Sequence, residues 1–77
     1  MKAGDMVRLK RPFYPVAASS RSYDYGIVAE MITAAFPAAE TEVLVYLYDL
    51  ETAALYTDET GQPMYCFYKN ELSLVED

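Results

Sequence analysis

The sequence contains no histidine, no tryptophan and only one cysteine among its 77 residues. Histidine is the commonest general base and a common metal ligand, so its absence argues against most acid–base enzymes and most metal sites. A single cysteine, Cys66, excludes a disulfide within the chain. The carboxylate clusters that remain do not match a calcium-binding loop. We therefore expect no enzymatic activity, no catalytic residue, no metal and no cofactor.

Positive charge is scarce as well, because six Lys and Arg face twelve Asp and Glu, for a net charge of −6. A chain of this charge repels polyphosphate, which disfavours binding that rests mainly on the nucleic-acid backbone. No run of about 18 apolar residues is present to span a bilayer, and no signal-peptide core follows Met1. We expect a cytoplasmic protein with Cys66 as a buried, structural thiol, as suits a reducing compartment.

Apolar residues are plentiful, at 53% of the chain against 23% charged residues. That content is enough for one core, and the length is too short for two, so residues 1–77 are predicted to form a single domain. Residues that alternate with a period of two predict five short strands, over residues 6–10, 25–32, 42–48, 64–68 and 72–74.

Proline, glycine and serine mark the connections between these strands. Residues 11–25 contain two prolines and three serines, so they are predicted to form a long first loop, which in a small domain is mobile or functional. Residues 33–41 are predicted to form a second loop. Residues 55–57 are expected to form a hairpin with residues 64–67 across a turn that contains Gly61. A tight turn is expected over residues 69–72.

Short strands without a convincing helix favour an all-β fold that closes on itself and hides its sheet edges. The predicted architecture is a small five-stranded SH3-like barrel. It has a long first loop, a three-stranded meander and one short helical turn, and its last strand pairs back near the first.

Two segments carry a family resemblance. Residues 4–12 and 25–30 resemble the opening two strands of SH3-like barrels of the KOW type and of the small photosystem I reaction-centre subunit IV. Residues 70–75 are similar to the closing turn and strand of these barrels. More loosely, the whole chain resembles short uncharacterised SH3-barrel proteins of cyanobacteria. The resemblance implies an accessory role and no catalytic residues; the chain departs from subunit IV in its Ala-rich segment at 33–41 and its turn at 58–63.

Charge is unevenly distributed along the chain. Residues 1–25 carry five cations and two acids, whereas residues 26–77 carry one lysine and ten acids. A basic patch with neighbouring aromatic rings is typical of a contact surface for an acidic or Pro-rich partner. The alternative is a solvated face whose cations pair with nearby carboxylates. The candidate partner-binding residues are Arg8, Lys10, Arg11, Phe13, Tyr14, Arg21, Tyr23 and Tyr25.

The first hypothesis for function is a non-catalytic accessory or adaptor protein that binds a partner protein through the long loop after the first strand. The alternative is a KOW-like module that binds RNA or a ribosome-associated site, suggested by the early basic residues. A further alternative is a homodimer formed through an exposed strand edge or an apolar patch.

The core is expected to consist of the neutral face of each alternating strand. Val45 lies in the middle of the most apolar strand and is therefore predicted to be fully buried. The predicted core residues are Val7, Leu9, Ile27, Ala29, Val43, Val45, Leu47 and Leu74.

Overall fold

The computed structural model describes residues 1–16, 21–32 and 41–75, and within these ranges the chain is all-β, without an α-helix. The loop predicted at 33–41 therefore lies outside the described residues, apart from Thr41. The elements in chain order are β1 (Met6–Phe13), β2 (Tyr23–Ile32), β3 (Glu42–Asp49), β4 (Ala54–Leu55), β5 (Met64–Tyr68), the 3-10 turn η1 (Lys69–Glu71) and β6 (Leu72–Leu74).

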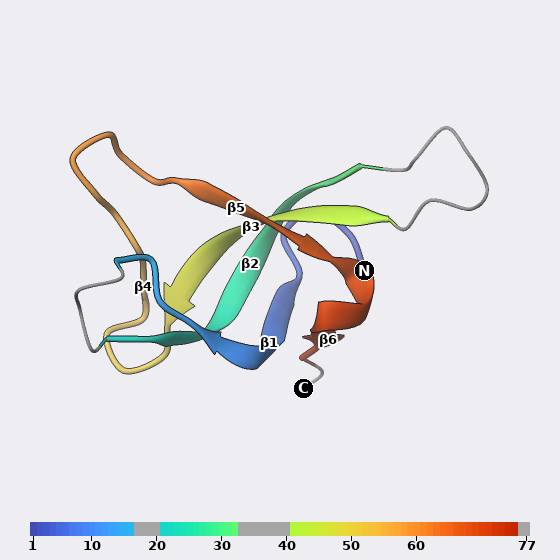
Figure 1. Cartoon of the computed structure of the whole chain (residues 1–77), viewed down its shortest axis with the longest axis horizontal. Coiled ribbons are helices and arrows are strands. Elements are labelled where there is room, and N and C mark those ends of the chain that lie inside the picture. The colour runs from blue at the N-terminus through green and yellow to red at the C-terminus, as the bar shows by residue number, and fades with distance from the viewer. Residues whose placement is uncertain (17–20, 33–40, 76–77) are drawn as a thin grey trace.

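All strand pairs are antiparallel, and the strand order in the sheet is β4-β3-β2-β1-β6, with β5 paired to β3. Figure 1 shows β1, β2 and β3 side by side, with the C-terminal end of the chain beside β1. The predicted return of the last strand to the first is confirmed, because Val7 opposes Leu74 and Leu9 opposes Leu72. The tight turn before this strand is also confirmed, as η1.

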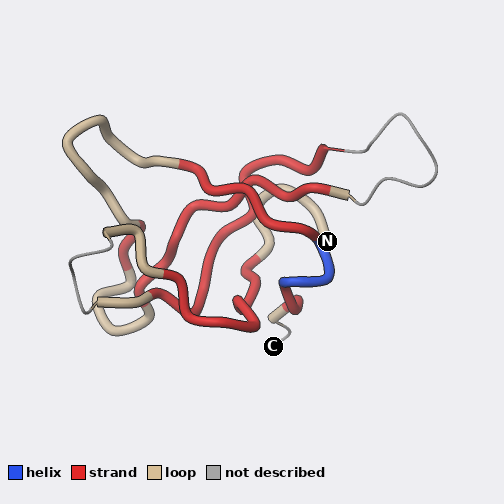
Figure 2. The backbone as a smooth tube through the Cα atoms, in the orientation of Figure 1, coloured by secondary structure: helices blue, strands red, loops and turns tan. Residues whose placement is uncertain are grey.

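The predicted hairpin between residues 55–57 and 64–67 is wrong. β4 pairs with the end of β3, whereas β5 pairs with the first part of β3, from Glu42 to Tyr46. Both therefore lie along one edge of β3 and together act as one interrupted strand. The chain leaves the sheet between them (Figure 2), after the N–H of Tyr56 donates a last hydrogen bond to the carbonyl oxygen of Leu47. Pairing with β3 rather than with each other places Tyr65 and Phe67 against the core.

The predicted first loop is shorter than expected at both ends, because β1 continues to Phe13 and β2 already begins at Tyr23. Pro12 is tolerated inside β1 because the pairing register with β2 breaks between Arg8 and Phe13. Residues 9–12 therefore have no partner on β2, and no backbone donor is needed from the proline. Proline content alone does not reveal this irregularity.

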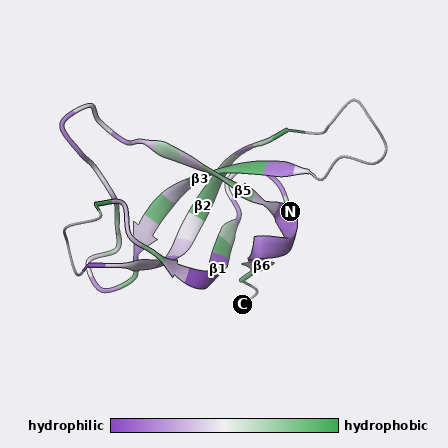
Figure 3. Cartoon of the chain, in the orientation of Figure 1, coloured by the Kyte–Doolittle hydropathy of each residue, from purple (hydrophilic) through white to green (hydrophobic). Residues whose placement is uncertain are grey.

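Five of the eight predicted core residues are confirmed as buried, Val45 among them with no exposed surface. The prediction is wrong for the other three, Ile27, Ala29 and Leu74. The first two are half-buried, and Leu74 is 41% exposed near the end of the chain. Figure 3 shows the apolar residues concentrated on the strands, with hydrophilic residues over η1 and the turns. The observed core consists of Val7, Leu9, Tyr23, Val28, Val43, Val45, Leu47 and Leu72.

A β-bulge in β2 explains why Val28 is in the core. Val28 opposes Val45, but the next pair is Glu30 with Leu44, so Ala29 is an extra residue. Under strict alternation, Val28 and Glu30 would share one face, so burying Val28 would also bury the charged Glu30. The sequence pattern therefore predicts that the other face, with Ile27 and Ala29, is buried. The bulge reverses the faces at Ala29, so Val28 is buried and Glu30 is exposed.

The burial of Val45 predicts the cost of its truncation. Val45→Ala should lower the free energy of unfolding by about 1–3 kcal/mol through lost transfer energy and a residual cavity. Tyr46→Ala should cost less, because Tyr46 lies on the outer face of β3. Urea melts of both variants measure the difference, and a larger loss for Tyr46→Ala would contradict the assignment of faces.

A close backbone approach predicts a second effect. A Cβ added at Gly26 would lie 2.2 Å from Val45 Cγ1 and 2.8 Å from the Tyr46 carbonyl oxygen. Gly26→Ala should therefore destabilise the fold by at least about 1–3 kcal/mol, the usual cost of overpacking. Adding Val45→Ala removes the nearer clashing atom, so the double variant should be more stable than the sum of the two losses predicts. Additive losses in urea melts would show that this contact is not what requires glycine.

Candidate functional site

The alternation of side chains along β1 sets the direction in which its cationic residues point. Val7 and Leu9 turn into the core, so Arg8 and Lys10 face outward and both are exposed. Arg8 lies between two neighbouring strands, where Tyr25 of β2 is its partner on one side. Ser73 of β6 is its partner on the other side. β1 therefore presents its charges from within the sheet rather than from a free strand end.

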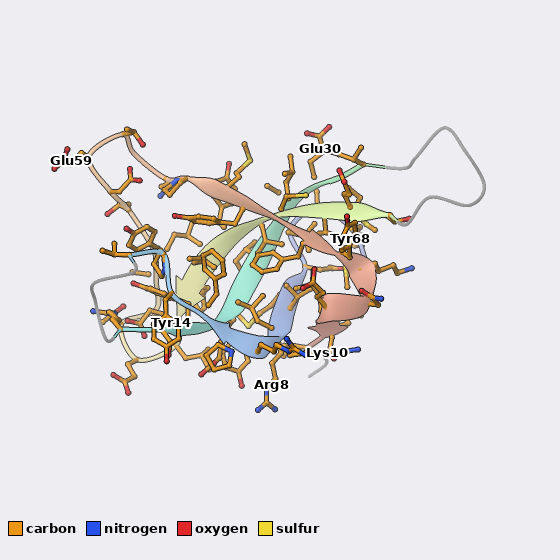
Figure 4. The ribbon with its side chains drawn as sticks, in the orientation of Figure 1. Arg8, Lys10, Tyr14, Glu30, Glu59 and Tyr68 are labelled. Atoms are coloured by element: carbon orange, nitrogen blue, oxygen red, sulfur yellow. The ribbon has the colours of Figure 1, made fainter. Side chains whose placement is uncertain are left out.

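The charged residues are distributed unevenly in the folded structure as well as along the sequence. Figure 4 shows Arg8 and Lys10 on the lower side of the molecule, whereas Glu30 and Glu59 project from the opposite side. The basic surface of β1 is thus separated from much of the acidic surface. Asp24 and Glu71 nevertheless line depressions that also contain Lys10, so this separation of charge is partial.

Two open depressions lie beside β1. One of about 440 Å³ is lined by residues 9–13 of β1 together with Phe67, Asn70 and Glu71. The other, of about 410 Å³, lies toward β6, where Arg8 and Ser73 contribute to its lining. Lys10 and Pro12 line both depressions because they lie in the irregular part of β1 between them.

Arg8, Lys10 and Arg11 are exposed, and none of them forms an ion pair with any residue in the described ranges. Whereas Arg21 does form an ion pair, with Asp49, these three residues differ from the alternative expectation, in which the cations pair with nearby carboxylates. A ligand carboxylate therefore has no intramolecular ion pair to displace here. We call Arg8, Lys10, Arg11, Phe13 and Tyr14 the β1 cationic surface.

The aromatic members of this surface differ in exposure. Phe13 is half-buried, and its ring centroid lies 4.8 Å from that of Tyr65 and 5.5 Å from that of Phe67. The ring thus forms an apolar part of the wall of the larger depression beside Lys10. Tyr14 follows β1 directly and is 51% exposed, so its ring is open to contact.

Arg21, Tyr23 and Tyr25 line another depression, although Tyr25 is also the cross-strand neighbour of Arg8 and so borders the β1 cationic surface. Arg21 forms an ion pair with Asp49, and its guanidinium carbon lies 5.4 Å from the ring centroid of Tyr23. Tyr23 itself is a core residue, only 7% exposed, with its ring edge-on to that of Tyr56 at 5.4 Å, so most of its surface is closed to a partner. Tyr25 is half-buried and lines a separate depression together with Arg21.

Sequence reasoning missed the contribution of the chain's closing turn to the site. Asn70 and Glu71 of η1 line the larger depression beside residues 9–13. The Glu71 carboxylate accepts a hydrogen bond from the backbone N–H of Tyr68 at 2.9 Å, which holds the turn in place. The predicted pairing of the last strand with the first already implied that residues 69–72 lie near β1.

Cys66 is exposed rather than buried, because Tyr65 and Phe67 occupy the inner face of β5 and Cys66 lies between them on the outer face. Desolvation raises the pKa of its thiol, and the nearby carboxylates of Glu42 and Glu71 raise it further. The thiol therefore stays protonated near neutral pH, which is unlike an activated nucleophile. No group of three potential ligand side chains in the described part of the chain is placed to hold a metal ion.

No protein-family model, curated protein or solved structure gives a significant match to this chain. Among the residues that the structure describes, no helix has the length and apolar character needed to cross a membrane. Function is therefore inferred from the β1 cationic surface and its surroundings.

The Arg21–Asp49 pair predicts a pH effect. Burial opposes ionisation of Asp49, but the N–H of Glu51 and the Arg21 guanidinium together hold the pKa of this carboxyl below its ordinary value of 3.8. Because the folded-state pKa is lowered, the ionised carboxylate stabilises the fold above pH about 4, and this contribution disappears as the pH falls through the folded pKa.

Arg21→Leu should raise the pKa of Asp49 toward 3.8 in an NMR titration of its carboxyl carbon, because the guanidinium is removed. Arg11→Leu is the matched control and should leave this pKa unchanged. An unchanged value in Arg21→Leu would mean that the ion pair does not persist in solution.

Proposed function

We propose that this chain is a non-catalytic binding module, built as an SH3-like barrel, that docks an acidic partner protein through the β1 cationic surface. Support for the barrel comes from the strand order β4-β3-β2-β1-β6 and from η1, which precedes the strand that returns to β1. The resemblance to KOW-type barrels and to photosystem I subunit IV supports an accessory role. The free thiol of the exposed Cys66 favours a reducing compartment such as the cytoplasm.

The observation that carries this proposal is a set of three exposed cations, on a protein of net charge −6, that form no ion pair with any residue the structure describes. Charge complementarity across an interface directs encounter and selects the partner. Phe13 adds a half-buried ring next to Lys10 and Arg11, so an apolar contact accompanies the charged ones. An interface with an apolar centre and a charged rim has this composition.

A KOW-like RNA-binding function draws on the same cations but fits them less well. Neutralising about three phosphates leaves only weak affinity at physiological salt. The ten acids in residues 26–77 also repel the RNA backbone. A protein partner with a compact acidic patch avoids much of this repulsion, because its charge does not extend along the whole surface.

Affinity capture from a native extract tests the proposal with the double variant Arg11→Glu/Tyr14→Ala. We expect recovery of the partner to fall at least about tenfold, since a charge and a ring are lost from one surface. Lys2→Glu/Tyr68→Ala is the matched control, with the same chemical changes at exposed positions elsewhere. Equal recovery by the wild type and the Arg11/Tyr14 variant would exclude this surface as the contact.

Treating the captured complexes with ribonuclease, together with direct RNA binding at about 50 mM salt, separates the two partner classes. A protein partner that survives ribonuclease supports the proposal. RNA binding that is lost in Arg11→Glu would instead favour the KOW-like function.

A further inference from the structure

The sheet has a second apolar face, opposite the core. In one register row, Met6 of β1 opposes Ile27 of β2, Ile27 opposes Tyr46 of β3, and Tyr46 opposes Met64 of β5. These residues alternate with inward-facing ones, so they lie on the outer face. Met64 is 49% exposed, and the other three are half-buried. We call Met6, Ile27, Tyr46 and Met64 the apolar row.

The outer face of an antiparallel sheet is usually polar where it meets water. Here a continuous row of apolar and aromatic side chains crosses four strands at that position. A contiguous, partly exposed apolar patch, rather than scattered single residues, is typical of an interaction surface.

Opposite charges lie on the two sides of the apolar row. On one side, the neighbouring register row contains Arg8 next to Tyr25, and Tyr25 opposes Tyr48. On the other side, Glu30 opposes Leu44, because the bulge at Ala29 turns Glu30 outward. The outer face therefore carries a cation toward one end, a carboxylate toward the other, and the apolar row between them.

We propose that this outer face is the interface of a homodimer, in which a second copy packs face to face about a two-fold axis along the apolar row. Such an interface uses the same patch on both copies, so the patch must complement itself. Rotation by 180° about this axis places the apolar row against its own copy. The same rotation brings the Glu30 end of each copy over the Arg8 end of the other, so both charges find an opposite partner.

The two opposite charges are what favour a second copy over an unrelated protein. An apolar face alone would accept many partners, whereas a face with a cation and a carboxylate at opposite ends complements itself under a two-fold rotation. Arg11 lies in the irregular part of β1, which has no partner on β2, and lines the depression beside η1. The dimer therefore shares Arg8 with the β1 cationic surface, but it leaves Arg11 and the depression beside η1 open to a partner.

Sedimentation measurements from about 1 μM to about 1 mM test the dimer, since this range covers weak and moderate interfaces. The wild type should reach twice the chain mass of 8.7 kDa at the upper end. Met64→Glu should raise the dissociation constant at least about tenfold by placing a charge in the apolar row. Leu50→Glu is the matched control: Leu50 is 52% exposed but lies in the turn after β3, so its variant should dimerise normally.

A charge exchange tests the predicted orientation of the two copies. Arg8→Glu and Glu30→Arg should each weaken the dimer by bringing like charges together, and the double variant should recover most of the affinity because opposite charges face each other again. Thermal melts confirm that each variant is folded.

Three results would overturn the proposal. A monomer at every concentration would mean that the face is not a self-interface. A dimer that is insensitive to Met64→Glu would indicate pairing through another surface, such as a strand edge. Additive losses in the Arg8/Glu30 double variant would exclude the two-fold arrangement of charges.

Discussion

Burial of the inner face of β3 is the constraint on which the rest of this structure depends. Val43, Val45 and Leu47 have no exposed surface, and in a chain of 77 residues one such strand supplies much of the core. The backbone N–H and C=O groups of so buried a strand need partners on both edges, and β2 lies along one edge while β4 and β5 share the other. The closeness of β2 to β3 in turn requires glycine at position 26, where any Cβ would meet Val45.

Two departures from regular pairing give the protein its surfaces. The bulge at Ala29 buries Val28 and turns Glu30 outward, which sets a carboxylate on the outer face opposite the end that carries Arg8. The irregular stretch of β1 separates residues 9–12 from β2 and places Lys10 between two depressions. Each irregularity decides which side chains the sheet presents to solvent.

The proposed adaptor and homodimer surfaces share one physical basis. In a sheet, side chains alternate between two faces. One face packs in the core here, so the charged side chains and many of the aromatic ones lie on the other. Because acids outnumber cations in the chain, the few cations of β1 are a distinct feature, and in the proposed function they steer the encounter with an acidic partner. Arg8 belongs to both surfaces, whereas Arg11 lies in the irregular stretch of β1 and lines the depression beside η1.

Sequence by itself determined the all-β class, the return of the last strand to the first, and the inward faces of the segments that alternate without interruption. Val7 and Leu9 in β1, like Val43, Val45 and Leu47 in β3, obey a period of two that is a local property of the chain. Tertiary structure decided the faces on either side of Ala29, the burial of Tyr23 and the shared edge of β3. These depend on register and pairing between distant segments, where the gain from burying Val28 and Phe67 outweighs the local pattern.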